Sequence, residues 1–292
     1  MRGIDFRQAS SVISRPRTLL LTMLAMGAFA GNSLLCRLAL KHTVIDPATF
    51  TCVRMLSGAA VLWLIAVMRS AARQRAGSWP SALALFAYAA AFSFAYVELA
   101  AGTGALLLFG AVQTTMIVYG LGKGERLTGW QTLGLAAALG GLAALLLPGW
   151  SVPPLHSALL MIAAGMAWGV YSLRARGAGD PLIVTTGNFL RAAPLAVALS
   201  LVSFSHARAD VAGVAYAVAS GALTSGVGYA IWYAALRGLK ATSAATVQLS
   251  VPVITAAGGI LLLGEPLTLR LIGASIAVLG GIALVIRPRR HG

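Results

Sequence analysis

The chain has 292 residues, of which 59% are hydrophobic and only 10% are charged. Because soluble domains carry about a quarter charged residues, this composition excludes a soluble globular protein. A net charge of +15 would suggest nucleic-acid binding in a soluble protein. Here no basic cluster lies on a soluble segment, and we expect no nucleic-acid partner.

Long apolar runs follow one another along the chain, separated by Pro, Gly and charged residues. Runs of about 18 residues or more can cross a bilayer as helices. We therefore predict an all-α membrane protein with ten transmembrane helices, at residues 17–40, 47–68, 80–99, 103–122, 128–147, 156–174, 181–203, 210–236, 242–263 and 267–286. Ala28-Phe29-Ala30 imitates the cleavage site of a secretory signal. The apolar run continues to Leu40, so we expect this segment to be retained as the first span.

The distribution of Lys and Arg orients these spans. Most of them lie in the N-terminal tail, in the connections after even-numbered spans and in the C-terminal tail. The opposite side holds only Arg37, Lys41, Arg208 and Arg270. By the positive-inside rule, both termini are expected in the cytoplasm, and we expect a multi-pass protein of the bacterial inner membrane.

The two halves of the chain repeat each other. GERLT at 124–128 matches GEPLT at 264–268, and LGGLAALL at 139–146 matches LGGIALVI at 279–286. Small-residue helices resemble one another by chance, and close packing alone explains such motifs, but two matches in one register favour a true repeat. Each half would contain five spans, and because five is odd, the second half would enter the membrane inverted. Inverted repeats around a site at the midplane are typical of secondary transporters.

These residues resemble the drug/metabolite transporter superfamily, specifically its ten-helix EamA-type members. The Gly-Glu-Arg-Leu-Thr and Gly-Glu-Pro-Leu-Thr motifs carry the resemblance, with the Gly-Gly pairs after them and the openings Asp46-Pro47 and Asp180-Pro181. Segments 102–116, 166–181 and 187–194 are similar to bacterial amino-acid exporters of the YddG type. The resemblance implies a central cavity lined by spans 1, 3, 4, 6, 8 and 9, with spans 5 and 10 at the periphery. It divides the chain into a cytoplasmic tail, two EamA-like repeats and a second cytoplasmic tail, at residues 1–16, 17–150, 151–287 and 288–292.

Candidate substrate-binding residues are aromatic or amide side chains within the spans. Rings suit an apolar or aromatic substrate side chain, and amides can hold a zwitterion because they both donate and accept hydrogen bonds. The candidates are Asn32, Tyr88, Tyr96, Gln113, Trp168, Tyr171, Trp232 and Gln248. Helix packing, interface anchoring of the rings and inter-helix hydrogen bonding of the amides remain open as alternatives.

The ionisable residues of the spans have simpler explanations. Arg54 and Arg191 could either fix a substrate carboxylate or brace the repeat through backbone carbonyls. Because they occupy equivalent places in spans 2 and 7, outside the expected lining, we expect bracing. Glu98 is expected as a solvated carboxylate at a helix end, with proton coupling as the alternative. Glu125 and Glu265 are expected in the first turns of spans 5 and 10, where a carboxylate meets the positive helix end.

Backbone irregularities are expected in the second half. Pro194 lies within span 7, and Pro252 lies within span 9, one turn after Gln248. Proline interrupts helical hydrogen bonding and can create a pivot, so we expect a gate near Pro252. Gly226 and Gly228 add local freedom to span 8.

These features together predict a secondary carrier that exports neutral or aromatic amino acids, or related metabolites, by alternating access. The alternative within the superfamily is an exporter of drugs or of other metabolites such as sugars, nucleosides or polyamines. An integral-membrane enzyme and a channel are disfavoured, since the sequence offers no catalytic cluster and the repeat indicates a self-contained monomer. We expect a small-molecule substrate, the lipid bilayer as surroundings, no cofactor and no metal.

Overall fold

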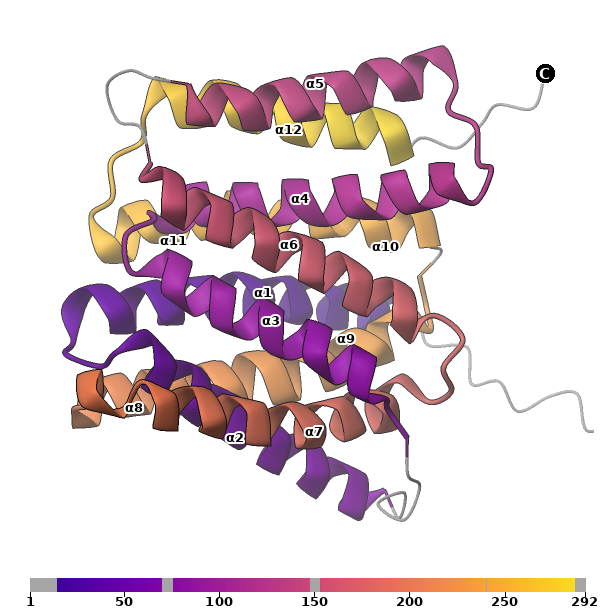
Figure 1. The fold of residues 1–292 in the computed structure, drawn as a ribbon. Helices are drawn as coiled ribbons and strands as arrows, with labels where there is room; N and C mark the ends of the chain where they lie inside the picture. The colour runs from indigo at the N-terminus through magenta and orange to yellow at the C-terminus, as the bar shows by residue number, and fades with distance from the viewer. Residues whose placement is uncertain (1–14, 70–75, 148–152, 240, 287–292) are drawn as a thin grey trace, which may run out of the picture.

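The computed structural model describes residues 15–69, 76–147, 153–239 and 241–286, and these ranges are almost entirely helical, with no strand (Figure 1). Ten helical spans in them are long and apolar enough to cross a membrane. The predicted ten-helix architecture is therefore confirmed. The residues of the predicted tail 288–292 lie outside the described ranges, as do residues 1–14 of the predicted tail 1–16.

The first half forms five uninterrupted helices. They are α1 (Arg15–His42), α2 (Pro47–Met68), α3 (Trp79–Tyr96), α4 (Ala101–Gly122) and α5 (Gly129–Leu146). Their ends differ from the predicted ones by up to three residues, and α1 begins two residues inside the predicted tail.

The second half has five spans, two of which are divided. The undivided ones are α6 (Leu155–Ala175), α7 (Pro181–Val202) and α12 (Leu269–Ile286). The eighth span consists of α8 (Val211–Val218), a π-helical segment η2 (Ala219–Val227) and α9 (Gly228–Leu236), after a short 3-10 turn η1 (Phe204–His206). The ninth span consists of α10 (Ala241–Gln248) and α11 (Ser250–Leu263).

The helix starts repeat between the halves because the same capping residues recur. Asp46 Oδ1 accepts hydrogen bonds from the backbone N–H groups of Ala48 and Thr49 at the start of α2. Asp180 caps α7 in the same way. Such side chains satisfy N–H groups that a helix start leaves without an internal partner. The Asp-Pro pairs read from the sequence are therefore helix starts.

Helices α5 and α12 lie side by side and antiparallel at one edge of the bundle (Figure 1). A methyl group on Gly134 would clash with the backbone of Gly281, and one on Gly141 would meet Ala274. In the repeat, Gly134 corresponds to Ala274 and Gly141 corresponds to Gly281. The contact between residues 134 and 281 is therefore the symmetry equivalent of the contact between residues 141 and 274. Most of both helices faces outward, which agrees with the expected peripheral position.

The other helix contacts are also related by the repeat. Helix α6 packs on α3 and α4, and α1 packs correspondingly on the eighth and ninth spans. Helix α2 packs on α7, and α4 packs on α11. Helix α1 begins and α12 ends at one end of the bundle, whereas the α4–α5 and α11–α12 connections lie at opposite ends (Figure 1). An inverted repeat requires this arrangement.

Candidate functional site

The centre of the candidate site is the indole ring of Trp168 on α6. Its centroid lies 4.8 Å from that of Tyr88 on α3 and 5.6 Å from that of Tyr229 on α9, to which it is nearly parallel. Tyr171, one turn further along α6, lies at 5.2 Å. Aromatic pairs at these separations attract beyond simple burial. Trp168 therefore brings together rings from both halves of the chain.

The aromatic cluster continues from this centre in two directions. On α3, Tyr88 contacts Phe92 at 5.4 Å, and Phe92 contacts Tyr96 edge-on at 4.7 Å. The four-residue spacing places these three rings on one face of the helix. From Tyr229, ring contacts lead to Phe29 on α1, and from Phe29 to Trp232. The cluster therefore spans helices α1, α3, α6 and α9 of the expected lining, and Phe189, whose ring lies 6.0 Å from that of Tyr229, adds α7, which lies outside it.

The amide of Asn32 connects the cluster to a polar group on the eighth span. Its Nδ2 donates to Tyr88 Oη at 3.2 Å, and its Oδ1 accepts from Ser220 Oγ at 2.8 Å and from Thr224 Oγ1 at 3.4 Å. Asn32, Tyr88 and Ser220 are all buried. Since a buried amide without partners is costly, these bonds fix the position of Asn32 beside the rings.

Arg54 on α2 reaches the same place, contrary to the bracing role expected for it. The residue is only 2% exposed. Its guanidinium lies over the rings of Tyr88 and Phe92, at 5.3 and 4.9 Å from their centroids, and its Nη2 donates to Tyr88 Oη at 3.2 Å. Its Nε and Nη1 atoms are buried and have no hydrogen-bond partner among the described residues.

Arg191, the matching residue of α7, behaves as predicted. Its Nη1 donates to the backbone carbonyls of Ala76 and Gly187, both at 2.8 Å. Asn188 beside it accepts from the backbone N–H of Ser78. These contacts tie α7 to the segment before α3. The equivalence of the two arginines therefore holds for their places in the repeat but not for their surroundings.

Two of the predicted candidates lie at the margins of the cluster. Tyr96 is fully buried, and its hydroxyl donates to the carbonyl of Ala101 at the start of α4. Trp232 is buried against Phe29, so its ring does not anchor at the surface of the bundle. Both are thus packed inside the bundle at the two extremes of the cluster.

The two predicted glutamines lie elsewhere. Gln113 is buried within α4, and Gln248 is the half-buried last residue of α10. The ring contacts and hydrogen bonds of the described residues connect neither side chain to the aromatic cluster.

Both irregular spans of the second half border the candidate site. The π-helical segment η2 carries Ser220 and Thr224, which bind Asn32. The ninth span is interrupted at Leu249, directly after Gln248. Pro252 explains this break, because a proline ring clashes with the carbonyl four residues before it and lacks the N–H that would bind it. π-Helical segments and broken helices are frequent at functional sites.

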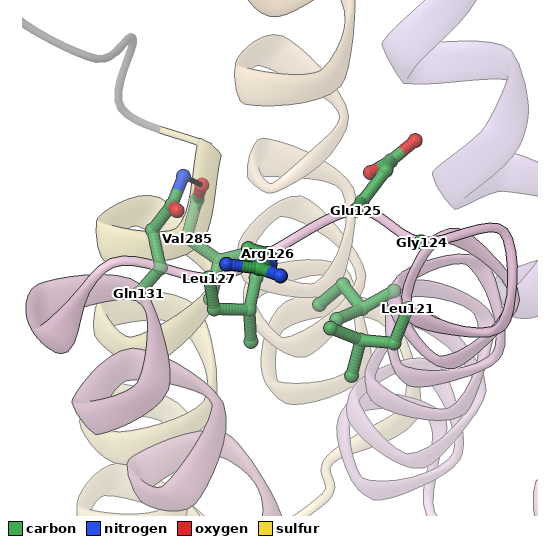
Figure 2. Close-up of a pocket in the computed structure, with 8 residues that line it drawn as sticks. Leu121, Gly124, Glu125, Arg126, Leu127, Gln131 and Val285 are labelled. Carbon is green, nitrogen blue, oxygen red and sulfur yellow. Dashed lines mark hydrogen bonds between the residues drawn. The ribbon is translucent and has the colours of Figure 1, made fainter.

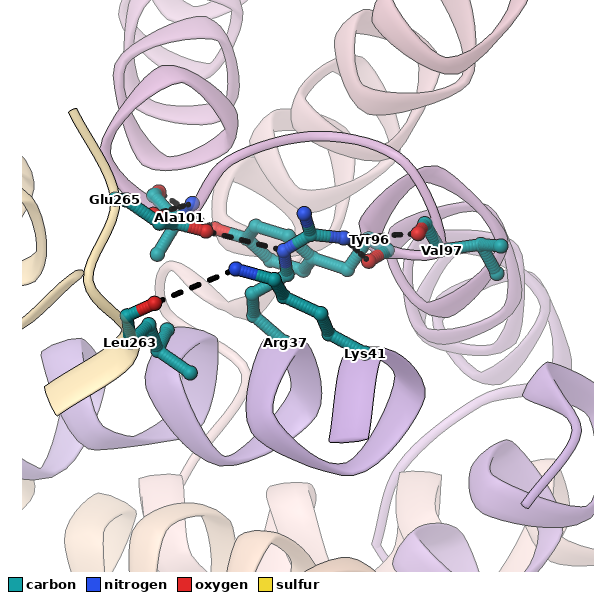
Figure 3. A network of polar contacts seen from close by, with 7 residues as sticks. All are labelled: Arg37, Lys41, Tyr96, Val97, Ala101, Leu263 and Glu265. Atoms are coloured by element: carbon teal, nitrogen blue, oxygen red, sulfur yellow. Dashed lines mark hydrogen bonds and ion pairs between the residues drawn. The ribbon is translucent and has the colours of Figure 1, made fainter. Parts of the chain in front are cut away.

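Glu265 joins four elements at one end of the bundle (Figure 3). Its Oε1 lies 3.1 Å from Arg37 Nε, and its Oε2 accepts the backbone N–H of Ala101, at the start of α4, at 2.7 Å. Arg37 also donates to the carbonyls of Tyr96 and Val97 at the end of α3. Both charged residues are at least nine-tenths buried. We call this set of contacts the Arg37–Glu265 network.

The predicted positions of the two motif glutamates are wrong. Helix α12 begins at Leu269 and α5 at Gly129, so neither glutamate lies in the first turn of the helix that follows it. Thr128 and Thr268 cap those helices instead. Glu265 does meet a positive helix end, but that of α4, which has no capping side chain of its own. This contact joins residues far apart in the sequence, so no local sequence pattern predicts it.

Glu125, the matching glutamate, is exposed at the opposite end (Figure 2). Like Glu265, it follows a glycine with positive φ, and its backbone N–H binds a glycine carbonyl of the preceding helix. Its carboxylate makes no ion pair with any described residue. A pocket of about 550 Å³ lies beside it, lined by Leu121, Arg126, Gln131 and Val285 among others. None of its lining residues belongs to the aromatic cluster, so this pocket is peripheral to the candidate site.

Glu98 lies at the surface and contacts two side chains at the start of α6. Its carboxylate accepts from Ser157 Oγ at 2.6 Å and lies 2.9 Å from His156 Nε2 at the start of α6. It lies just after the last residue of α3 and is exposed. These contacts agree with the expected helix-end carboxylate.

Sequence reasoning left Tyr229, Phe29 and Ser220 out of the candidate site. Tyr229 was visible as an aromatic residue of span 8, and Phe29 precedes Asn32 by one turn, so spacing could have suggested both. For Ser220 there was no local signal, because its position depends on the π-helical segment. Within the described residues, no group of His, Cys, Asp and Glu side chains could hold a metal ion.

Comparison with known proteins shows which proteins this chain resembles. The chain is 61% identical to an uncharacterized protein of Pseudomonas aeruginosa over 94% of its own length and 96% of the relative's. It is 29% identical to a protein of Streptantibioticus cattleyicolor described as a probable terminal-alkyne amino-acid exporter, over 70% of this chain and 71% of that one.

A solved crystal structure of a protein 19% identical in sequence shares the fold. Its TM-score is 0.63, and the match covers 93% of this chain and 98% of that one. The model of the EamA-like transporter family matches residues 155–287, the predicted second repeat almost entirely. Together with the ten apolar spans, these matches make the protein a multi-pass membrane transporter with a small-molecule substrate. The chain belongs to the EamA-like transporter family of the drug/metabolite transporter superfamily.

Proposed function

We propose that this protein is a secondary transporter of the bacterial inner membrane that exports neutral or aromatic amino acids, or related small metabolites, by alternating access. The observation that carries the proposal is the aromatic cluster around Trp168, with the Asn32 amide at its edge. Rings of both halves meet there, in the interior of a transporter fold.

The chemistry of the cluster suits an amino acid with an apolar or aromatic side chain. Such a side chain would stack on the faces of Trp168 and Tyr229, which lie nearly parallel. The amide and hydroxyl groups of Asn32, Tyr88 and Ser220 would meet its polar groups. A relative described as an amino-acid exporter supports the same substrate class.

The two ends of the bundle support alternating access. At one end the Arg37–Glu265 network joins α1, α3, α4 and the α11–α12 connection, whereas the matching Glu125 at the other end is exposed. In an inverted repeat, the opposite state would exchange these arrangements. The halves, residues 17–150 and 151–287, are then the units that exchange shapes, and one chain suffices for transport as a monomer.

Charge sets the orientation of the proposed transporter. The end of the bundle where α1 begins, α12 ends and the GERLT connection lies also carries most of the Lys and Arg of the described residues. By the positive-inside rule this end faces the cytoplasm. The Arg37–Glu265 network would then close the periplasmic end.

Transport by purified protein in proteoliposomes tests the substrate class. Counterflow of labelled phenylalanine, tryptophan, leucine and alanine is measured against sugars, nucleosides, polyamines and cationic dyes. We expect counterflow of the aromatic and larger apolar amino acids, and competition among them. Movement of dyes or other metabolites without any amino acid would establish the alternative exporter class instead.

A further inference from the structure

A buried cation without an anion lies in the candidate site, and this is the guanidinium of Arg54. Helix α2 starts at Pro47, so by helical rise Arg54 lies about 10 Å inside the span. An arginine near the bilayer centre costs about 2.5–3.5 kcal/mol even on insertion scales. Buried charges are normally paired, so the missing partner of Arg54 requires an explanation.

Among the residues that the structure describes, no carboxylate pairs with Arg54. All the described carboxylates lie at the ends of the spans, namely Asp46, Glu98, Glu125, Asp180, Asp210 and Glu265. Two of them form ion pairs elsewhere, Glu265 with Arg37 and Glu98 with His156. Arg191 and Arg37 donate to backbone carbonyls, whereas the hydrogen bond of Arg54 goes to a phenol, Tyr88 Oη. The N–H groups on Nε and Nη1 are left unsatisfied.

The position of the guanidinium matches the substrate site. Tyr88 contacts Arg54 through both its hydroxyl and its ring, and the same ring contacts Trp168. The hydroxyl of Tyr88 also accepts from Asn32, which anchors it. The ring of Tyr88 therefore separates the guanidinium from the ring of Trp168, on which the ligand would stack.

We propose that Arg54 binds the carboxylate of the transported substrate and so makes the protein selective for carboxylate-bearing compounds. This inference rests on the proposed function and specifies its substrate class. Guanidinium N–H groups bind planar carboxylates through paired hydrogen bonds, and a low-polarity site strengthens such a contact. The carboxylate neutralises Arg54, and the rings of Trp168 and Tyr229 receive the side chain.

Four probes that differ only in their charged groups test the carboxylate contact. They are phenylalanine, 3-phenylpropionate without the amine, phenethylamine without the carboxylate, and phenylalanine amide. Binding to detergent-purified protein is followed by tryptophan fluorescence, and counterflow by competition with labelled phenylalanine. We expect the wild type to bind the two carboxylates at least about tenfold more tightly than the other two probes, the minimum expected of hydrogen bonds to a charged group.

Substitutions separate recognition from structure. Arg54→Met keeps much of the volume and removes the charge, so we expect it to lose the preference for carboxylates while its melting temperature stays unchanged or rises. Arg54→Lys keeps the charge without the planar fork and is expected to retain part of the preference. Arg191→Met is the matched control, which should lower the melting temperature and leave the preference intact.

The outcomes distinguish the inference from the proposed function. The inference is overturned if Arg54→Met keeps the wild-type preference, if it weakens all four probes equally, or if the wild type binds no carboxylate. Should either variant at Arg54 fail to fold, the other variant and the wild-type preference still decide. A wild type that binds carboxylates but moves no amino acid contradicts the proposed function and leaves the role of Arg54 standing.

Discussion

Trp168 is the residue at which the rings of the two halves meet, and its substitution gives a direct prediction. Trp168→Ala removes the contacts with Tyr88, Tyr171 and Tyr229. Since an aromatic pair contributes about 0.5–1.5 kcal/mol beyond burial, we expect phenylalanine affinity to fall by roughly tenfold or more. Proteoliposome counterflow measures this loss.

Two variants serve as controls for Trp168. Trp168→Phe keeps a ring and should recover most of the affinity. Trp130 on α5 is 72% exposed and faces away from the cluster, so Trp130→Ala should transport normally. Equal losses in Trp168→Ala and Trp130→Ala would argue for a general effect on folding rather than a binding contact.

Single residues show where sequence reasoning ends. Arg54 and Arg191 are equivalent by position in the repeat, yet one donates to backbone carbonyls and the other lies over rings. The difference arises from neighbouring helices: a methyl group on Gly221 of η2 would meet the backbone of Arg54, which places α2 against the irregular span. No local pattern encodes such a contact. Conversely, the α3 ring series follows from its spacing alone.

At the scale of elements, the start of α2 allows a prediction of stability. Burial opposes ionisation of Asp46, but hydrogen bonds from Thr49 and from the backbone of Arg208, Thr49 and Ala48 outweigh it and lower the pKa of its carboxyl below 3.8. We expect Asp46→Ala to cost about 1 kcal/mol, as for other helix caps. Thermal melting in detergent at neutral pH measures this cost.

The pH dependence of this cap has a definite sign. Because the folded-state pKa is lowered, the carboxylate stabilises the protein above its unfolded pKa, and that contribution disappears as the pH falls through the folded value. Asp46→Asn keeps an acceptor without the charge, so its melting temperature should lie between those of wild type and Asp46→Ala at neutral pH. The difference between wild type and Asp46→Asn should vanish in strong acid. If it persisted there, the carboxylate charge would not be its source.

The broken ninth span gives a second prediction at this scale. Pro252→Ala restores the N–H that can bind the carbonyl of Gln248, so α10 and α11 should join into one helix. We expect a higher melting temperature and a slower counterflow rate, because the pivot stiffens. Pro194→Ala is the control, since Pro194 lies within the uninterrupted α7. Wild-type rates in Pro252→Ala would exclude a role of the break in transport.

The positions and ends of the helices were predicted better than the residue contacts, and the reason is physical. The Asp-Pro pairs, the threonines of the two motifs and the length of the apolar runs are local signals of helix ends. The interruptions were predicted only in part: Pro252 marks its break, whereas the π-helical segment follows from packing on α1 and α2. Glycines at 226 and 228 indicated freedom there but not its form.

At the scale of the whole molecule, the matching glutamates of the two halves have different surroundings: Glu265 is buried and Glu125 is exposed. Residues Arg37 and Glu265 are separated by 228 positions, and their contact requires the folded bundle. The sequence predicted the inversion from the two motifs, but it did not predict that Glu265 is buried and Glu125 exposed, since the two motifs are nearly identical. If the alternating-access proposal holds, the opposite state would exchange the two surroundings.

The last prediction concerns the equilibrium between these states. Glu265→Gln removes the ion pair with Arg37, and Arg37→Met also removes the bonds to Tyr96 and Val97. We therefore expect the network end to open more often, and more in Arg37→Met than in Glu265→Gln. A cysteine at Leu99, which is 1% exposed, reports opening through its rate of labelling by a membrane-impermeant maleimide, with Cys36 and Cys52 replaced by alanine. Glu125→Gln, the matched control at the exposed end, should leave this rate unchanged. If Leu99→Cys were labelled at the wild-type rate in Glu265→Gln and in Arg37→Met, the Arg37–Glu265 network would not hold this end closed.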